Sequence, residues 1–354
     1  MGSHKKLFSL LCVPLLFLLL LLSGLQSEAR LQRGDKVNYG LKKLFVFGDS
    51  YVDTGNIKKG ESKSWSVPYG VTFPGKPVGR FSDGRVLSDY IAKYLGLKSP
   101  IPYRLRKLVP QHLKYGMNFA FGGTGVFDTF VQAPNMTTQI DLFHQLIIEK
   151  IYSPSDLTNS LALVSVAGND YTQYIQTNGS VQGFPSFIAS VVNQTVTNLI
   201  RIQRLGVKKI VVNGVQPIGC LPQSTFTSSF QQCNSTVTNL VVLHNNLLNQ
   251  AVNKLNQQTK GHSTFIILDL YDSFMSVLNQ PSTNHIKDPL KPCCVAISSE
   301  YSCGSVDKDN VKKYKVCDNP QSTFFWDMVH PTQAGWNAVY NNLQMTSAFQ
   351  QLRY

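Results

Sequence analysis

Four short apolar runs, each leading into a polar or glycine-containing turn, constrain the fold of this chain more than any other feature. The first run, Leu44-Phe45-Val46-Phe47, leads into Gly48-Asp49-Ser50. The other three runs and their turns are 161–166 before Gly168-Asn169-Asp170, 209–212 before Asn213-Gly214, and 265–268 before Asp269. A run that is apolar almost throughout, interrupted here only by Ser165 and Lys209, is typical of a strand covered on both faces, so the four runs predict one buried sheet.

Segments with helical spacing lie between these runs. In 187–205, apolar and small residues recur every three or four positions, as they do again in 240–255. On the first segment they are Ile188, Val191, Val192, Thr195, Leu199 and Ile202. Alternating strands and helices predict an α/β fold, a three-layer α/β/α sandwich with a central, mainly parallel sheet. Ligands bind beyond the carboxyl ends of such strands, so the turns at 48–50 and 168–170 are expected at one edge.

Residues 1–29 are predicted to be a signal peptide. Lys5 and Lys6 precede an apolar run at 7–22, and small residues around Ala29 fit cleavage after that position. The run is shorter than the ~20 apolar residues of a bilayer span, which favours a signal peptide over a membrane anchor. We therefore expect no stable membrane insertion.

Residues 30–354 are predicted to form a single domain, because no linker, repeat or low-complexity stretch divides them. Removal of residues 1–29 takes away two lysines and one glutamate, so the formal charge falls from +13 to +12. The lysines are scattered and form no basic stripe, which disfavours a nucleic-acid partner. The net charge suits solubility or an anionic cell-wall or lipid surface. We expect a monomer.

Six cysteines remain after residues 1–29 are removed, and an even number in an exported chain predicts disulfides. Cys220 and Cys233 are isolated from the others and are expected to pair. The other four, Cys293, Cys294, Cys303 and Cys317, allow three pairings, and adjacent Cys293 and Cys294 are expected to take different partners. A zinc site is the alternative, disfavoured because no Cys-x-x-Cys spacing occurs.

Four Asn-x-Ser/Thr sequons are consistent with export and would mark glycosylated surface positions. They are Asn135, Asn178, Asn193 and Asn234. Together with the signal peptide and the cysteines, they predict a secreted glycoprotein, extracellular or in the cell wall.

Ser50 and His330 are the candidates for nucleophilic catalysis. A serine hydroxyl needs a neighbouring base, usually a histidine held by a carboxylate. His330 has Asp327 three residues before it, so one tight turn would present both side chains. Pro331 follows, and a helix is expected over 332–339. The alternative role for His330 is to cap that helix.

Acyl transfer also needs hydrogen-bond donors aimed at the developing oxyanion. Asn169 offers a side-chain amide. The segment Asn118 to Gly125 contains Gly122 and Gly123, whose backbone N–H groups no side chain covers. Either segment taken alone is an ordinary turn sequence, so the order of the motifs along the chain carries the information.

These motifs resemble four blocks of the plant-type GDSL esterase/lipase family in the SGNH hydrolase superfamily, and the resemblance runs over about 44–339. The blocks are Phe47-Gly48-Asp49-Ser50-Tyr51-Val52-Asp53-Thr54-Gly55-Asn56, 118–125, Gly168-Asn169-Asp170 and Asp327-Met328-Val329-His330-Pro331-Thr332. Tyr51 stands where the family name has leucine. The four cysteines ahead of Phe325-Trp326-Asp327 also resemble the plant branch.

The resemblance implies that Ser50 is the nucleophile, His330 the base and Asp327 its orienting carboxylate. It implies hydrolysis of carboxylic esters of small molecules or lipids through an acyl-enzyme, with no metal or organic cofactor. No Gly-x-Ser-x-Gly elbow surrounds Ser50, so a shallow cleft is expected. Loops 58–79 and 216–232 are expected to line it.

The implied oxyanion hole comprises the Ser50 N–H, the Gly123 N–H and the Asn169 side chain. Gly123 is preferred over Gly122 because it lies five residues after Asn118, the spacing of the family block.

Three other functions are compatible with parts of the pattern. An acyltransferase would use the same residues with an alcohol as acceptor, and a non-catalytic binding protein would keep only the fold. A metal-dependent phosphoesterase would use Asp49, Asp53, Asp170 and His330. That last alternative leaves Ser50, Gly123 and Asn169 unexplained, and the sequence does not predict the natural ester.

Overall fold

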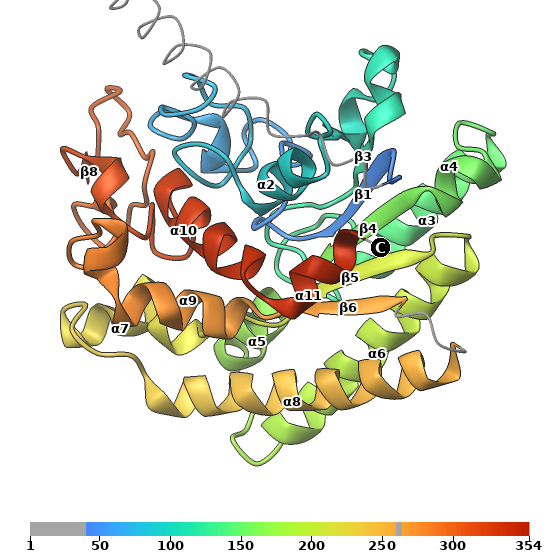
Figure 1. Ribbon diagram of the computed structural model, residues 1–354. Helices are drawn as coiled ribbons and strands as arrows, with labels where there is room; N and C mark the ends of the chain where they lie inside the picture. Colours follow the sequence, from blue (N-terminus) through green and yellow to red (C-terminus); the bar gives the residue numbers. More distant parts are fainter. Residues whose placement is uncertain (1–39, 260–263, 354) are drawn as a thin grey trace, which may run out of the picture. The chain divides into compact units, whose positions relative to one another are not determined.

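A six-stranded sheet forms the centre of the computed structural model, which describes residues 40–259 and 264–353 (Figure 1). Every neighbouring pair of strands is parallel, in the order β2-β3-β1-β4-β5-β6. The strands are β1 (Lys43–Gly48), β2 (Ile101–Pro102), β3 (Gly116–Asn118), β4 (Ser160–Ser165), β5 (Lys209–Asn213) and β6 (Phe265–Leu268). The predicted parallel sheet is confirmed, whereas the predicted signal peptide lies outside the described residues.

Helices cover both faces of this sheet. In Figure 1, α6 and α8 lie below the strands, and α2 and α10 lie above them. The longer helices are α2 (Leu87–Tyr94), α3 (Met136–Ile148), α5 (Gly168–Gln176), α6 (Phe184–Arg204), α8 (Ser235–Gln258), α9 (Leu270–Asn279) and α10 (Gln333–Gln344). The shorter ones are α4 (Pro154–Thr158), α7 (Pro222–Thr225) and α11 (Ser347–Gln350). This arrangement confirms the three-layer α/β/α sandwich.

The hydrophobic core lies on both faces of the central strands. All six residues of β4 and the last five of β1 are buried, which explains why these strands read as continuous apolar runs. On α3, Phe143 packs its ring 4.6 Å from that of Phe45 and 5.5 Å from that of Phe47. The six residues that helical spacing placed on one face of α6 are all buried, as predicted.

The strand order places a crevice between β1 and β4. After β1 the chain forms β2 and then β3 on one side, and it later enters β4 on the other side of β1. Connections that leave neighbouring strands in opposite directions create the switch point at which α/β proteins bind ligands. The turns after these two strands carry Ser50 and Asn169. They are held together by a hydrogen bond from Asp49 N to the Ser165 carbonyl, 3.1 Å long.

A small antiparallel hairpin, β7 (Cys294–Ala296) and β8 (Tyr314–Val316), precedes Asp327 and was not predicted. Two disulfides, Cys293–Cys317 and Cys294–Cys303, lie in and around it. The adjacent cysteines therefore take different partners, and the predicted Cys220–Cys233 disulfide is also present. Because each of the six sulfurs is bonded to another, none is free to bind zinc.

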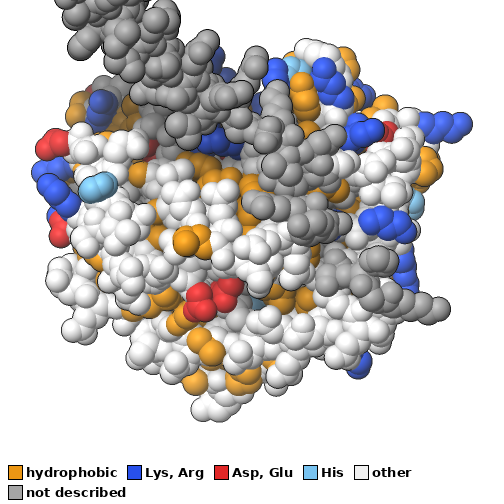
Figure 2. All heavy atoms as spheres, in the orientation of Figure 1, with side chains coloured by type: hydrophobic (Ala, Val, Ile, Leu, Met, Phe, Trp, Pro, Cys, Tyr) orange, Lys and Arg blue, Asp and Glu red, His pale blue; other side chains and the backbone are white. Residues whose placement is uncertain are grey.

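The surface of the described residues is mixed in character. None of their helices is both long and apolar enough to cross a membrane. On the face shown in Figure 2, lysine and arginine side chains occur in separate groups, most of them near the edge of the view. The middle of this face is mostly white and orange, with one group of acidic side chains in it.

Candidate active site

Ser50 lies in a tight turn directly after β1. Val52 N and Asp53 N donate to the Asp49 carbonyl over 3.2 and 2.9 Å, which closes the turn. Gly48 has a φ of +145°, and a Cβ at this position would lie 2.1 Å from the Ser165 carbonyl oxygen. Only glycine therefore allows β1 to approach β4 this closely, so the glycine fixes the place of the serine that follows.

Asp327 and His330 share a second tight turn. The Oδ1 atom of Asp327 accepts hydrogen bonds from Val329 N and His330 N, both 2.8 Å long. A side-chain oxygen that binds the backbone two and three residues later is a common way for aspartate to stabilise a turn. The turn presents both side chains on one side, as the three-residue spacing predicted.

Thr332 caps α10, and His330 does not. Thr332 Oγ1 accepts from Gly335 N over 2.8 Å, and the helix covers Gln333–Gln344. The helix expected over 332–339 therefore begins one residue later, because Thr332 is its N-cap, and ends five residues further on. A capping role for His330 is thus wrong, and the imidazole is left for another contact.

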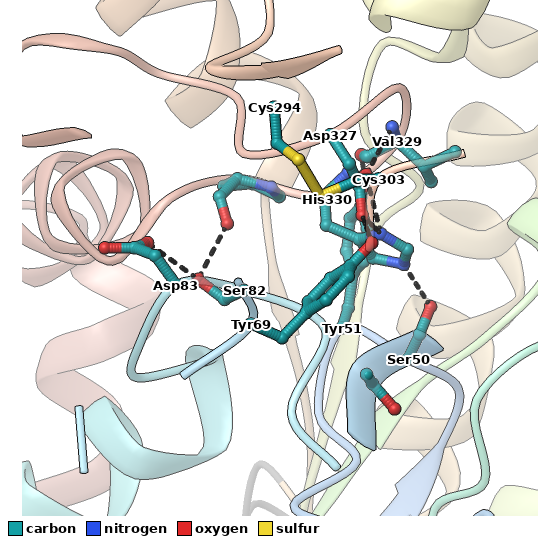
Figure 3. Close-up of polar contacts among 12 residues, drawn as sticks. Ser50, Tyr51, Tyr69, Ser82, Asp83, Cys294, Cys303, Asp327, Val329 and His330 are labelled. Carbon is teal, nitrogen blue, oxygen red and sulfur yellow. Dashed lines mark hydrogen bonds and ion pairs between the residues drawn. A yellow bond between two sulfur atoms is a disulfide. The ribbon is translucent and has the colours of Figure 1, made fainter. Parts of the chain in front are cut away.

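Ser50, His330 and Asp327 form one hydrogen-bonded row (Figure 3). His330 Nε2 lies 2.8 Å from Ser50 Oγ, and His330 Nδ1 lies 2.9 Å from each carboxylate oxygen of Asp327. The serine and the aspartate are nearly completely buried. The fold thus brings together three side chains that the sequence analysis selected from opposite ends of the chain.

The charge of Asp327 sets the direction of these hydrogen bonds. Burial raises the pKa of its carboxyl group, but the His330 charge and hydrogen bonds from His330, Tyr69 and Val329 outweigh burial and lower the pKa below 3.8. A carboxylate only accepts, so Nδ1 of His330 carries the proton that points at it. In the neutral imidazole the lone pair of Nε2 then faces Ser50, the arrangement that a general base requires.

Two of the predicted oxyanion donors, the backbone N–H groups of Ser50 and Gly123, differ from the neighbouring Gly122 N–H in having no acceptor among the described residues. Gly122 N donates to Asp53 Oδ2 over 3.0 Å, so its N–H group is already used. Within residues 40–259 and 264–353, neither Ser50 N nor Gly123 N donates a hydrogen bond. This difference agrees with the preference for Gly123 over Gly122 that came from sequence spacing.

Asn169 contacts the segment 118–125 and shares a pocket with Ser50. Its Nδ2 atom donates to the Thr124 carbonyl over 2.9 Å, which leaves the second N–H of the amide for another acceptor. Asn169 and Ser50 line the same small pocket, of about 70 Å³, whereas Gly123 is not part of the described lining. The remaining lining residues are Asp49, Tyr51, Gly168, Thr172, Gln216, Ile218, Leu221, Gln223 and Val329.

The two loops expected to line the cleft behave differently. Loop 216–232 supplies Gln216, Ile218, Leu221 and Gln223 to the pocket, as predicted. Loop 58–79 supplies none of the lining. It instead contacts Asp327, because Tyr69 Oη donates to Asp327 Oδ2 over 2.7 Å. No sequence pattern marks this tyrosine.

Three buried aspartates, Asp49, Asp53 and Asp170, hold the loops of the site. The sequence did not predict this supporting role. Burial raises the pKa of Asp49 to about 7, and those of Asp53 and Asp170 to about 6, although backbone hydrogen bonds oppose the rise. Their backbone donors are Tyr51 for Asp49, Gly55, Asn56 and Gly122 for Asp53, and Val126 and Phe127 for Asp170. Their oxygens thus hold backbone turns, not a shared ligand. The sequence pointed to them only as members of the first and third blocks and as residues of the alternative metal-dependent phosphoesterase.

Tyr51 ties the two turns together. Its hydroxyl donates to the Val329 carbonyl over 3.0 Å, and its ring packs edge-on against Trp336, with ring centroids 5.0 Å apart. A leucine at this position would make no such hydrogen bond. The tyrosine therefore adds a polar link between the Ser50 turn and the His330 turn.

Comparison with known proteins identifies the family. Residues 44–343 match the family model for GDSL-like Lipase/Acylhydrolase. The chain belongs to this family. A GDSL esterase/lipase of Arabidopsis thaliana is 56% identical over 96% of this chain and 94% of its own length. The GDSL-family assignment confirms the predicted plant-type resemblance, and with it a carboxylic ester hydrolase.

Two further relatives of this GDSL hydrolase extend the comparison. A second Arabidopsis thaliana GDSL esterase/lipase is 52% identical over 85% of this chain and 87% of its own length. Acetylajmalan esterase 2 of Rauvolfia serpentina is 30% identical over 85% of this chain and 88% of its own length. Such relatives support an ester as the substrate.

Proposed function

We propose that this GDSL hydrolase cleaves carboxylic esters with Ser50 as nucleophile, His330 as general base and Asp327 as the carboxylate that orients the base. The observation that carries the proposal is the contact of 2.8 Å between His330 Nε2 and Ser50 Oγ, with His330 Nδ1 bound to Asp327. No metal or organic cofactor is needed, because the three side chains supply the nucleophile and move its proton.

In the first half-reaction, Ser50 Oγ attacks the ester carbonyl while His330 Nε2 takes the hydroxyl proton. Asp327 stabilises the imidazolium that forms. The oxyanion accepts hydrogen bonds from Ser50 N–H, Gly123 N–H and the free N–H of Asn169, each worth about 3 kcal/mol in other enzymes. His330 then gives its proton to the departing alcohol, which leaves an acyl-enzyme on Ser50.

In the second half-reaction, water attacks the acyl-enzyme and His330 again accepts and returns the proton. The substrate we propose is a small-molecule or lipid ester with a short acyl group. The pocket of about 70 Å³ beside Ser50 supports this, because ligand pockets for larger molecules have about 300–1,000 Å³. An acetyl ester also matches the name of the Rauvolfia serpentina relative.

We propose further that the protein is a secreted glycoprotein, extracellular or in the cell wall, with residues 1–29 removed and 30–354 forming one domain. Three disulfides support export, because they persist in oxidising compartments. Among the sequons, Asn178, Asn193 and Asn234 are exposed, whereas Asn135 is half-buried and caps α3. We also propose a monomer without a nucleic-acid partner or stable membrane insertion.

Ester hydrolysis by the purified protein tests the chemistry. We expect Ser50→Ala and His330→Ala each to reduce kcat for p-nitrophenyl acetate by at least about 1,000-fold at neutral pH. Ser165→Ala is the matched control, because it removes a buried serine hydroxyl at the end of the neighbouring strand. Wild-type kcat in His330→Ala would contradict the assigned base. Product analysis with added alcohols separates hydrolysis from acyl transfer.

A further inference from the structure

Tyr69 contacts the site through Asp327. Its side chain is buried, and its hydroxyl donates to Asp327 Oδ2 over 2.7 Å (Figure 3). The residue does not line the pocket beside Ser50 in the described structure, so any effect on the reaction must pass through Asp327. The sequence separation of 258 residues means that only the fold brings the two together.

The two carboxylate oxygens of Asp327 depend on different donors. Oδ1 accepts from Val329 N, His330 N and His330 Nδ1, over 2.8, 2.8 and 2.9 Å. Oδ2 accepts from the same His330 Nδ1 over 2.9 Å and from Tyr69 Oη. Without the Tyr69 hydroxyl, Oδ2 would accept only from His330 Nδ1, whose single N–H group it shares with Oδ1. The tyrosine hydroxyl therefore satisfies the second oxygen and resists rotation of the carboxylate.

We propose that Tyr69 is a positioning residue, which extends the row Ser50–His330–Asp327 by one hydrogen bond and keeps the Asp327 carboxylate aligned with His330 Nδ1. The proposal rests on the proposed function of that row. Tyr69 is then the fourth side chain of this row, and it touches neither the substrate nor the reacting atoms.

The protonation states fix the direction of the new hydrogen bond. Burial, the negative charge of Asp327 and the hydrogen bond to it raise the pKa of Tyr69 well above 10. The phenol is therefore protonated wherever the enzyme is folded. Because the pKa of Asp327 lies below its usual value, this pair consists of one donor and one acceptor over the working pH range.

The ring of Tyr69 is held by a rigid cluster. It packs edge-on against Trp326 at 6.1 Å between ring centroids, beside the disulfides Cys293–Cys317 and Cys294–Cys303. Within that cluster, the Cys294 N–H donates to the Trp326 carbonyl over 2.7 Å. The hairpin therefore braces the residue directly before Asp327 and the ring that carries its hydrogen-bond donor.

The segment directly after loop 58–79, to which Gly70 N donates at the Ser82 carbonyl over 3.0 Å, is attached to the residues after His330. Ser82 Oγ donates to the Pro331 carbonyl over 3.0 Å, and Gln333 N donates to Asp83 Oδ1 over 2.7 Å. These contacts do not involve the phenol. Removal of the hydroxyl alone should therefore leave the loop in place and change only the support of Asp327.

Tyr69→Phe tests the proposal against Tyr314→Phe as a matched control. Tyr314 lies in the same cluster, but its hydroxyl donates to the Val67 carbonyl over 3.0 Å and not to Asp327. We expect Tyr69→Phe to lower kcat for p-nitrophenyl acetate about 10-fold, as for one lost hydrogen bond to a charged group, with KM within about 2-fold. Tyr314→Phe should keep kcat within about 2-fold of the wild type.

A spectroscopic readout separates positioning from general loosening. The low-field proton resonance of His330 Nδ1–H should move in Tyr69→Phe and stay in place in Tyr314→Phe. An unchanged resonance, an unchanged kcat in Tyr69→Phe, or equal losses of kcat in both variants would overturn the proposal.

The Asp327→Asn background distinguishes this proposal from the proposed function. There, Tyr69→Phe should cause a much smaller further loss of kcat, because no charged carboxylate remains for Tyr69 to align with His330 Nδ1. If Asp327→Asn alone keeps wild-type kcat, the proposed row itself is wrong. If Asp327→Asn is impaired and Tyr69→Phe is not, only the role of Tyr69 fails.

Discussion

Asp170→Asn should separate stability from activity in this enzyme. Asp170 Oδ2 accepts from Val126 N and Oδ1 from Phe127 N, both over 2.9 Å, so the carboxylate holds the loop that begins at Gly122. A Cβ on Gly125 would lie 2.4 Å from Asp170 Oδ2, which shows how closely the loop lies on this side chain. Asparagine keeps the shape but has only one accepting oxygen. One of the two N–H groups would face an NH₂ group.

The magnitudes predict opposite effects on folding and catalysis. Burial raises the pKa of Asp170 from 3.8 to about 6, so its stabilising contribution is complete below pH 3.8 and is lost as pH rises through 6. At pH 8 the ionised group therefore costs about 3 kcal/mol, which a neutral side chain removes. The N–H group of Val126 or Phe127 that loses its acceptor costs about 1–3 kcal/mol of folding free energy. The loop should then shift and move Gly123 out of place, so we expect kcat to fall about 10-fold.

Thermal unfolding and esterase kinetics at pH 5 and pH 8 measure both quantities. We expect Asp170→Asn to have an unfolding temperature at pH 8 at least as high as that of the wild type. Its unfolding temperature should also change less between pH 5 and pH 8, and its kcat for p-nitrophenyl acetate should be lower. Asp128→Asn is the control, because Asp128 is exposed in the same loop and binds only Asn135 through its side chain. A variant with wild-type kcat, or one that is destabilised at pH 8, would refute the reasoning.

Two further predictions concern the pocket and the hairpin. Leu221→Ala should enlarge the pocket and raise the ratio of kcat/KM for p-nitrophenyl butyrate to that for the acetate several-fold; an unchanged ratio would show that Leu221 does not limit acyl length. Replacement of both Cys294 and Cys303 by serine should cost about 2–4 kcal/mol of unfolding free energy and lower kcat, because the disulfide braces β7, whose Cys294 N–H holds the Trp326 carbonyl directly before Asp327. Denaturant unfolding and esterase assays check this, and wild-type values of both would contradict it.

Much of the sheet was predictable because its central strands are covered on both faces. Strands β1, β4, β5 and β6 read as apolar runs, and the observed bounds differ from the predicted ones by at most one residue at either end. β3 was missed because Gly116-Met117-Asn118 is short and contains only one apolar side chain. The hairpin of β7 and β8 was missed because its position depends on disulfides whose pairing the sequence left open.

The site was predictable to the extent that its residues occur in recognisable local motifs. Ser50, Asn169 and His330 each occur in such a motif, and the fold brings them to one edge of the sheet. Tyr69 occurs in none, because its contact with Asp327 depends on the path of a long loop. Asp170 lies in a motif, but its role as a support appears only once the loop at 122–127 is placed over it.

Labelling with a fluorophosphonate probe, followed by peptide mass spectrometry, tests the central claim most directly. The probe reacts with a serine only where a base activates the hydroxyl and donors stabilise the charged adduct. We predict one adduct, on the peptide that contains Ser50, in the wild type and in Ser165→Ala, and none in Ser50→Ala. Labelling of Ser50→Ala equal to that of the wild type, or an adduct on a different serine, would contradict the assignment of Ser50 as the nucleophile.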